Sequence, residues 1–506
     1  MKELSTNTLA QLSSATVALP AAAHLALPEK VLQFGTGVLL RGLPDYLIDK
    51  ANRQGVFNGR IVVVKSTDGG DITAFTRQDG LYTLCIRGIE DGQQVEENVV
   101  CSAISRVLSA KSQWAEVLRC AQSPDLAVVI SNTTEVGIQL VADDIRTSPP
   151  QSFPGKLLAV LYARYQAFQG DPAKGLVIVP TELIPENGAK LEAILLELAH
   201  RNGLEAEFID WLETANTCCN SLVDRIVPGR PAAALQAALE AELGYNDDLL
   251  TMSEVYRLWA IEGDEKVRRV LSFEQADAGV VVQPDINQFR ELKLRMLNGT
   301  HTLSCGLAYL AGFDTVRAAM EDEVLGAFIS SLMQDNLRRG IPYPVPEDVS
   351  REFGRQVLDR FRNPYIEHRW LGITLNYSAK LQLRNVATLL GYVERYQRVP
   401  ACAALGFAGY LLFMRGTQEQ DHTWYGELNG QTYPIQDEKA AYFADLWQRL
   451  DAAELTTTVL RNSTLWGHDL TTLPGFAAQV SSHLQAMLDQ GVYATVASHL
   501  TAQVSA

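Results

Sequence analysis

The stretch "KVLQFGTGVLLRGLPDYLIDKA", residues 30–51, decides the fold of the first half of the chain. Its apolar start is typical of a buried strand, its glycines mark a tight turn, and its end has the spacing of an amphipathic helix. Similar strands follow in "GRIVVVKSTDGG" (59–70), "DLAVVISNTTEVG" (125–137) and "KGLVIVPTELIPENG" (174–188). Strands that alternate with helices predict a mostly parallel sheet covered on both faces.

Two further patterns complete the expected architecture. Residues 77–100, "RQDGLYTLCIRGIEDGQQVEENVV", contain two Asp-Gly pairs, which favour an antiparallel hairpin inserted into the sheet domain. From about residue 290 the spacing is helical, as in "DTVRAAMEDEVLGAFISSLMQDNLRRG" (314–340) and "EKAAYFADLWQRLDAAELTTTVLRNS" (438–463). We therefore expect an α/β half followed by a mainly α-helical half.

Charge and composition exclude several classes of protein. The net charge of −16 over 506 residues repels nucleic acid and anionic membranes, so an anionic substrate would need a local group of cations. Seven cysteines without a CxxC pair fit a reducing compartment, and the eight histidines show no zinc-binding spacing, so we expect no metal. The start of the chain lacks the continuous apolar run of a signal peptide, and no later segment is long and apolar enough to span a membrane. We expect a cytoplasmic protein whose first residues form a loosely held extension.

The glycine turn after the first strand predicts a nucleotide site. Gly35 permits the bend and Gly37 lets the backbone approach a pyrophosphate at the start of the helix. The motif departs from GxGxxG because Leu40 stands at its third glycine, so a plain strand-to-helix turn remains open. Asp68, at the end of the second strand, is the candidate ligand for the ribose and favours NAD, although Lys65 would tolerate NADP and Asp68 alternatively caps a turn. We expect a Rossmann-like NAD-binding domain at 28–285, after an extension at 1–27 and before a helical substrate domain at 286–506.

The second candidate site lies in "KLRMLNGTHTLSCGLAYLAG", residues 293–312. At about 100° per residue, Asn298 lies roughly 140° and His301 roughly 80° round a helix from Lys293, so the three share one broad face. That face is either the wet edge of an exposed helix or a site. We expect it at the junction of the two domains, where ligand sites commonly form.

The spacing K-x4-N-x2-H after a Rossmann-like half resembles the mannitol dehydrogenase family, the polyol-specific long-chain dehydrogenases. The resemblance covers nearly the whole chain, and "SNTTEVG", "NSLVDRIVPGRP", "RFRNPYIEHRW" and "YPIQDE" are most similar to members that act on hexuronates. It implies a two-domain, metal-independent enzyme that transfers hydride between NAD(H) and the carbonyl carbon of an open-chain sugar derivative.

Roles for single residues follow from the same resemblance. Lys293 matches the general acid/base, and Asn298 and His301 match groups that hold the reacting oxygen and the neighbouring hydroxyl. Asp224 matches a polar substrate-side residue, although an ion pair with Arg225 or a loop cap explains it equally well. The cofactor is assigned to the backbone and side chains of Gly35, Thr36, Gly37, Val38, Leu39, Asp68, Asn132 and Thr133.

One departure from the family pattern concerns the oxyanion site. Sugar-alcohol members carry an Asp-Asn pair where this chain has "TELIPENG", so a second amide donor is in doubt. Glu182 is expected to bind substrate hydroxyls instead; a turn carboxylate is the simpler alternative.

A uronate also needs cations for its carboxylate. "NPYIEHRWLGITLNYSAKLQLRN" offers His368, Arg369, Lys380 and Arg384, of which we assign Arg369 and Lys380 to the substrate, although an ordinary basic helix face remains open. The Arg of sugar-alcohol relatives, eight residues before the matching Lys, is replaced here by Gly372.

The resemblance to the members that act on hexuronates implies the NAD-dependent interconversion of tagaturonate and altronate as the expected reaction. Reduction requires a proton for the oxygen, which the Lys293 ammonium supplies; oxidation requires the neutral amine and should prefer alkaline pH. The alternatives are the reduction of fructuronate, the mannitol 2-dehydrogenase reaction, and an NAD(H)-sensing protein without turnover. A monomer or a small homo-oligomer is expected.

Overall fold

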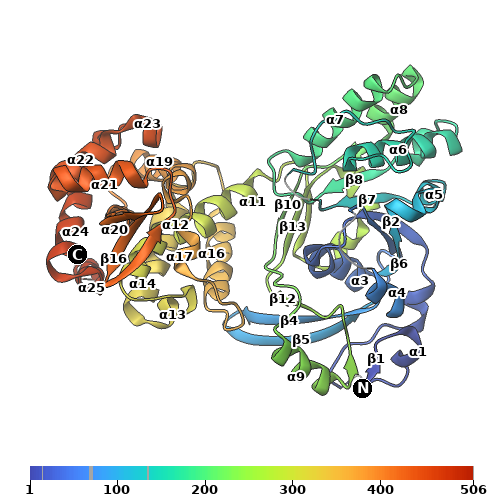
Figure 1. Ribbon diagram of the computed structural model, residues 1–506, viewed down its shortest axis with the longest axis horizontal. Coiled ribbons are helices and arrows are strands. Elements are labelled where there is room, and N and C mark those ends of the chain that lie inside the picture. Colours follow the sequence, from blue (N-terminus) through green and yellow to red (C-terminus); the bar gives the residue numbers. More distant parts are fainter. Residues whose placement is uncertain (14, 68–71, 134–135, 505–506) are drawn as a thin grey trace. The chain divides into compact units, whose positions relative to one another are not determined.

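The computed structural model describes residues 1–13, 15–67, 72–133 and 136–504. The chain divides into two compact units (Figure 1). The first comprises Met1–Gly88 and Gln94–Ile286, and the second comprises Ile89–Gln93 and Asn287–Ala506. The first unit contains alternating strands and helices and the second is mainly helical, as the change in the spacing of apolar residues near residue 290 predicts.

A parallel sheet organises the first unit. Within the described residues its strand order is β6-β3-β2-β7-β8-β9, and all neighbouring strands in it are parallel. The strands are β2 (Glu29–Phe34), β3 (Arg60–Lys65), β6 (Ile104–Ser109), β7 (Val128–Ser131), β8 (Val177–Pro180) and β9 (Thr217–Cys218). The strand order changes direction at β2, because β3 and β6 lie on one side of it and β7, β8 and β9 lie on the other. Open parallel sheets bind their ligands outside the carboxyl ends of the strands at such a switch point.

Both faces of this sheet are buried, as its continuous apolar strands predict. Alternate residues of β2 enter different cores: Val31 packs with α3 (Tyr46–Arg53), whereas Leu32 and Phe34 pack with the helices of the opposite face. Figure 1 shows α3 on one side of the sheet and α5–α8 on the other. Those four helices are α5 (Ala110–Ala121), α6 (Phe153–Ala167), α7 (Asn187–Arg201) and α8 (Ala206–Ala215). The expected α/β architecture is confirmed.

The expected hairpin is present as β4 (Tyr82–Glu90) and β5 (Gln93–Cys101). The loop between them is Asp91-Gly92, and both residues have positive φ, 55° and 73°, as a type I′ turn requires. Strand β12 (Thr251–Glu254) extends the sheet beside β4. The other Asp-Gly pair, Asp79-Gly80, follows α4 (Thr73–Arg77) and leads into β4 rather than joining two strands.

The expectation of a loosely held N-terminal extension is wrong. Strand β1 (Lys2–Glu3) pairs in parallel with β11 (Tyr245–Asn246), and Leu4 and Val17 are buried in a core with helix α9 (Ala233–Leu243). The apolar residues of this segment, which are too few and too scattered for a signal peptide, pack against the folded unit instead. A separate sheet, β10 (Ser221–Asp224), β13 (Leu258–Glu262) and β14 (Val280–Gln283), and helices α1 (Thr6–Leu9) and α10 (Glu265–Val270) complete the unit.

The second unit is mainly helical, as expected, but two of the anticipated long helices are interrupted. Asp322 ends the first segment and caps α14, accepting hydrogen bonds from the N–H groups of Val324 and Leu325. Asp451 separates α21 (Ala440–Arg449) from α22 (Ala452–Arg461) in the same way, accepting from the N–H groups of Ala453 and Glu454. An Asp at a helix start satisfies backbone donors that would otherwise be unpaired, so these two residues favour a new helix over a continuous one.

The helices of this unit, in chain order, are α11 (Asn287–Glu291), α12 (Gly299–Leu310), α13 (Val316–Glu321), α14 (Glu323–Ser331), α15 (Arg338–Gly340), α16 (Glu347–Phe361), α17 (Trp370–Ile373), α18 (Tyr377–Leu381), α19 (Ala387–Tyr396), α20 (Ala401–Phe413), α21 (Ala440–Arg449), α22 (Ala452–Arg461), α23 (Ser463–Trp466), α24 (Phe476–Gln490) and α25 (Val492–Val504). Three π-helical segments interrupt them: η5 (Leu292–Asn298), η6 (Leu332–Leu337) and η7 (Gln382–Val386). None of the helices in the described residues is long and apolar enough to span a membrane.

The sequence interpretation did not include a small antiparallel sheet in this unit. It consists of β15 (Gln418–Gln420), β16 (Thr423–Leu428) and β17 (Gln431–Ile435). The loop between the last two strands is Asn429-Gly430, again with positive φ at both residues, 51° and 77°. Asn-Gly between two short strands is a strong hairpin signal, so the sequence did contain the information.

All seven cysteines are free thiols, and all but the half-buried Cys218 are buried. Burial raises the pKa of the thiols of Cys85, Cys219 and Cys305 to about 12. These side chains therefore behave as small apolar groups rather than as thiolates.

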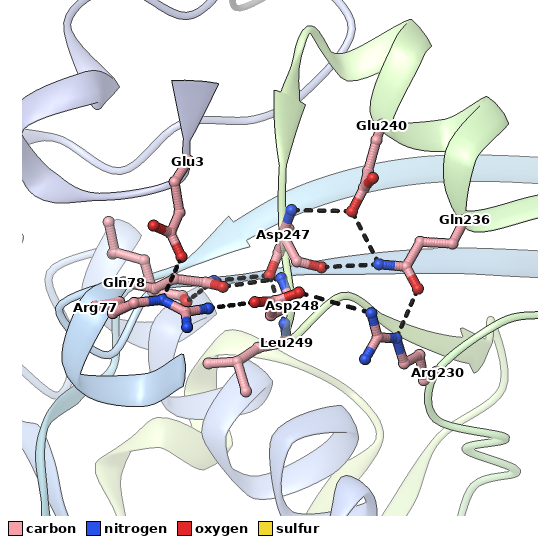
Figure 2. A network of polar contacts seen from close by, with 10 residues as sticks. Glu3, Arg77, Gln78, Arg230, Gln236, Glu240, Asp247, Asp248 and Leu249 are labelled. Carbon is pink, nitrogen blue, oxygen red and sulfur yellow. Dashed lines mark hydrogen bonds and ion pairs between the residues drawn. The ribbon is translucent and has the colours of Figure 1, made fainter. Parts of the chain in front are cut away.

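A buried carboxylate joins the segment after β11 to the start of β4 (Figure 2). Asp247 has no exposed surface and accepts three hydrogen bonds, from Gln78 Nε2 at 2.7 Å, the Thr83 N–H at 2.6 Å and the Leu249 N–H at 2.8 Å. The neighbouring Asp248 is exposed and pairs with two arginines, Arg77 and Arg230.

These neighbours provide a matched test of stability. Asp247→Ala leaves three buried donors without an acceptor and should lower the free energy of unfolding by roughly 3 kcal/mol or more. Asp248→Ala removes only exposed ion pairs and should cost less than about 1 kcal/mol. Urea unfolding followed by circular dichroism measures both, and equal losses would contradict the structural role of Asp247.

Candidate active site

The glycine turn leaves no room for a side chain at its first position. Gly35 has a φ of +128°, and a Cβ atom there would lie 2.8 Å from the carbonyl oxygen of Asn132. The N–H of Gly35 donates to the carbonyl of Val64, the penultimate residue of β3, at 3.0 Å. The turn is therefore held between the carboxyl ends of β3 and β7, at the switch point of the sheet.

The next residues open a helix whose first N–H groups lack a side-chain cap. Gly37 is the N-cap of α2 (Val38–Leu40), which continues through the π-helix η2 (Arg41–Asp45) into α3. A Cβ added at Gly37 would meet nothing within 4 Å, so the space in front of this helix start is open. Uncapped N–H groups at a helix start bind anions such as a pyrophosphate. The backbone of Gly37, Val38 and Leu39 thus fits the phosphates of a dinucleotide.

The missing third glycine has a structural explanation. Leu40 is fully buried in the core on the α3 side, and Gly42 takes over close packing, since a Cβ there would lie 2.7 Å from the side chain of Val227. Arg41 stabilises the turn by donating a hydrogen bond to the carbonyl of Thr36 at 3.0 Å. Asp68, the candidate ribose ligand, lies outside the described residues.

Glu182 is held inside the first unit rather than pointing freely outward. It is 2% exposed, and its two oxygens accept from Ser131 Oγ at 3.1 Å and from the Thr133 N–H and Oγ1 at 2.8 and 3.0 Å. Burial raises its pKa, against the opposing effect of these hydrogen bonds. Glu182 therefore joins the ends of β7 and β8, and its assignment to substrate hydroxyls stays a prediction.

Two other assigned residues lie near strand ends of the first unit. Asn132 follows β7, and its Nδ2 donates to the carbonyl and Oγ1 of Thr181 at 3.2 and 3.0 Å, which orients the amide. Asp224 is the last residue of β10 and is buried. The binding roles assigned to Asn132 and Asp224 stay predictions.

Lys293 and Asn298 lie in the π-helix η5, not in a regular α-helix. Hydrogen bonds in a π-helix join residues five apart, so these two residues, five apart, lie one above the other. The angle of roughly 140° expected from α-helical geometry is thus wrong. Both side chains are half-buried, and α12 begins directly after Asn298. Single π-helical turns occur frequently at functional sites.

Contacts with a second π-helix hold η5 in place. Arg295 pairs with Glu291 at 3.0 Å and donates to the carbonyls of Leu383 and Arg384 in η7 at 2.6 and 3.1 Å. Asn385 Nδ2 donates to the carbonyl of Gly299 at 3.1 Å. The charge of Arg295 is therefore paired, and this side chain holds η5 against η7. No local sequence pattern predicts these three hydrogen bonds, because they depend on the π-helical turns.

His301 is buried and neutral. Its ring stacks on Phe361 at 4.2 Å and meets the rings of His368 and Trp370 edge to face at 4.8 and 6.1 Å. Burial lowers the pKa of His301 well below its usual range, and His368, Arg360, Arg384 and Lys380 lower it further. Its buried Nε2 has no hydrogen-bond partner among the described residues. Such an atom can bind a hydroxyl or carbonyl oxygen of a ligand, depending on the tautomer.

The assigned cations differ in their surroundings. Arg369 has a 70% exposed side chain and pairs with Glu367, which does not favour contact with a substrate. Lys380 is partly buried and donates to the carbonyl of Ile373 at 3.0 Å. Arg384, which the sequence offered without assignment, is partly buried and donates to Thr302 Oγ1 at 3.0 Å. No three His, Cys, Asp or Glu side chains of the described residues are grouped so that they could hold a metal ion.

Comparison with known proteins identifies the family. Residues 29–274 match the model of the mannitol dehydrogenase Rossmann domain, and residues 285–488 match that of the mannitol dehydrogenase C-terminal domain. The chain belongs to the mannitol dehydrogenase family. The resemblance inferred from Lys293, Asn298 and His301 is therefore confirmed.

Relatives within the mannitol dehydrogenase family include altronate oxidoreductases. Those of Yersinia enterocolitica and Bacillus subtilis are 37% and 38% identical to this chain, over 93% and 92% of it and 97% and 94% of their own lengths. Among solved structures, mannitol 2-dehydrogenase of Pseudomonas fluorescens, in a ternary complex with NAD and D-mannitol, is 25% identical, with 99% of both chains covered and a TM-score of 0.66. A D-sorbitol dehydrogenase shares the fold with a TM-score of 0.74 at 22% identity.

The lowered pKa of His301 predicts a specific dependence of stability on pH. An unfolded histidine takes up a proton below about pH 6.5, whereas the folded protein resists it, so the unfolded state binds more protons at low pH. Stability should be fully present above that pH and be lost below it, by up to about 1.4 kcal/mol per pH unit. His301→Gln should reduce this loss between pH 6.5 and 5 without abolishing it, because burial also lowers the pKa values of His368, His483 and His499. Exposed His200→Gln should not reduce it. Identical slopes for wild type and His301→Gln in urea titrations would show that His301 is not kept neutral.

Proposed function

We propose that the protein is an NAD-dependent oxidoreductase that interconverts D-tagaturonate and D-altronate. Altronate oxidoreductases that are 37–39% identical over at least 92% of this chain support the substrate pair. The observation that carries the proposal is the start of α12. There, Lys293 and Asn298 lie one π-helical turn apart, and a neutral His301 with an unpartnered Nε2 follows.

Each of these side chains has a separate task in carbonyl reduction. NADH, when bound, supplies the hydride to the carbonyl carbon. The ammonium of Lys293 attracts the negative charge that develops on the oxygen and donates the proton that completes the alcohol. Lys293 is left neutral and regains a proton from solvent. In the reverse direction the neutral amine accepts the hydroxyl proton, which favours oxidation at alkaline pH.

Asn298 and His301 orient the substrate in this mechanism. The amide of Asn298 donates a hydrogen bond to the reacting oxygen and stabilises it as its charge grows. His301 holds the neighbouring hydroxyl through Nε2 without adding a second positive charge beside Lys293. The stack on Phe361 fixes the ring plane, so the direction of this hydrogen bond is set before the substrate binds.

The first unit supplies the nucleotide site. The turn at Gly35, the open helix start at Gly37 and the switch point of the sheet fit a pyrophosphate. We assign Gly35, Thr36, Gly37, Val38 and Leu39 to the phosphates, and Asn132 and Thr133 to the nicotinamide side. Preference for NAD over NADP is assigned to Asp68.

A second candidate reaction is the oxidation of an uncharged hexitol such as mannitol, favoured by the likeness to mannitol 2-dehydrogenase. A third candidate is the reduction of fructuronate, which uses the same chemistry. An NAD(H) sensor, the fourth, would bind the nucleotide without turnover. A panel of tagaturonate, fructuronate and fructose with NADH, followed by the loss of NADH absorbance, separates all four. Turnover of tagaturonate well above the others is the expected result.

The role of Lys293 predicts a selective loss of rate. Lys293→Ala should lower kcat by roughly two to four orders of magnitude, the range for a lost general acid, and leave the Kd for NADH near that of wild type. Exposed Lys439→Ala, in the same unit, serves as the control. Stopped-flow reduction and NADH fluorescence give the two quantities. Full kcat in Lys293→Ala would remove this residue from the mechanism.

A substitution at Gly37 should instead weaken the binding of NADH. Because an added Cβ meets no protein atom there, Gly37→Val should fold normally, but its side chain would occupy the path of the pyrophosphate. The Kd for NADH should rise by about tenfold or more, as expected for losing one hydrogen bond to a charged group. Gly372→Val, also at an open position, is the control. An unchanged Kd would place the phosphates elsewhere.

A further inference from the structure

Two cations of the second unit lie partly buried without an acidic partner. Lys380 is in α18 and Arg384 is in η7, four residues later. Their hydrogen bonds go to neutral acceptors, the carbonyl of Ile373 and Oγ1 of Thr302, both at 3.0 Å. No ion pair joins either side chain to a carboxylate within the described part of the chain.

This arrangement is costly in the absence of a ligand. A partly buried cation loses hydration, and like charges four residues apart on a helix repel each other. Both effects lower the pKa of Lys380, burial most and Arg384 second. Three other buried or partly buried cations are paired with carboxylates: Lys50 and Arg257 with Asp277, and Arg295 with Glu291. The buried Arg164 forms no ion pair among the described residues, but it donates four hydrogen bonds to backbone carbonyls. Lys380 and Arg384 have neither kind of compensation, since each donates a single hydrogen bond.

The pair is connected to the residues assigned to catalysis. Thr302, which accepts from Arg384, is the neighbour of His301 in α12 and donates through Oγ1 to the carbonyl of Asn298 at 2.8 Å. The positive charges of Arg384 and Lys380 also lower the pKa of His301. Arg384 therefore contacts the first turn of α12, next to His301, and Lys380 lies one helical turn before Arg384.

We propose that Arg384 and Lys380 form a carboxylate subsite that selects sugar acids over uncharged sugars. This inference rests on the proposed function and names the groups that recognise the acidic end of its substrate. Arg384 retains guanidinium donors beyond the one used for Thr302 and can bind a carboxylate with a planar fork, while Lys380 adds a point charge. The bound carboxylate neutralises the repulsion between the two cations. In this proposal Arg384, not Arg369, is the arginine that contacts the substrate.

The experiment compares a charged ligand with its uncharged counterpart. D-altronate and D-altritol, which has a CH₂OH group in place of the carboxylate, are titrated calorimetrically into the protein with NADH bound, a combination that cannot react because neither alcohol accepts a hydride. Arg384→Met and Lys380→Met should each raise the Kd for altronate by about 10- to 100-fold, as expected for a lost charge-assisted hydrogen bond. The Kd values for altritol and for NADH should stay within about twofold of wild type. Arg384→Lys should recover part of the affinity because it keeps the charge.

Two controls separate this role from a general effect of charge or folding. Exposed Arg449→Met, which loses an ion pair with Asp445, should leave the altronate Kd unchanged. Without ligand, Lys380→Met should unfold at the same temperature as wild type or higher, because one of two repelling charges is removed. A lower unfolding temperature for Lys380→Met would mean that the pair stabilises the fold, and would overturn the proposal.

The remaining outcomes distinguish the subsite from the reaction. If altronate binds Arg384→Met as tightly as wild type, or if Arg369→Met weakens binding instead, the subsite is wrong even when tagaturonate is reduced normally. If the wild-type protein binds altronate through Arg384 but does not reduce tagaturonate with NADH, the subsite stands and the proposed reaction fails.

Discussion

A carbonyl oxygen 2.8 Å from the position of a missing Cβ sets the geometry of the nucleotide half. Because Gly35 has no side chain, the chain can turn between β3 and β7 directly after the central strand. The helix that follows then starts at the carboxyl edge of the sheet, with its N–H groups uncapped and space in front of Gly37. Both faces of the central strand are buried, so the turn cannot shift without disturbing two cores.

The second unit depends on a different constraint, the widened turns of two π-helices. A π-helix is rare because its hydrogen bonding is less favourable than that of an α-helix, so tertiary contacts must hold it. Here Arg295 binds carbonyls of the opposite π-helix, and Asn385 binds the carbonyl of Gly299. These bonds align Lys293 with Asn298 and place Arg384 beside Thr302. The catalytic assignment and the carboxylate subsite thus depend on the same braced pair of segments.

The sequence predicted those features that follow from local pattern. Apolar runs gave the parallel sheet, and Asp91-Gly92 gave the hairpin. The same kind of signal at Asn429-Gly430 predicts the hairpin of β16 and β17. The capping residues Asp322 and Asp451 lie within continuous helical periods, so the spacing of apolar residues alone does not reveal the breaks. The π-helical turns had no local pattern to reveal them, so the relation of Lys293 to Asn298 required the structure. The choice between Arg369 and Arg384 also required it, since only burial and partners distinguish two arginines on one basic segment.

The buried thiols have a practical consequence for following how the protein unfolds. Cys85, Cys101, Cys120 and Cys219 lie in the first unit, and Cys305 and Cys402 lie in the second. A thiol reagent reaches such groups only when the surrounding core opens. The raised pKa values of the thiols of Cys85, Cys101, Cys120, Cys219 and Cys305 also slow any reaction in the native state. Mass spectrometry of pulse-labelled protein can therefore assign each modified cysteine to its unit. The chain carries its own residue-specific reporters, which can tell whether the two units open together or one after the other.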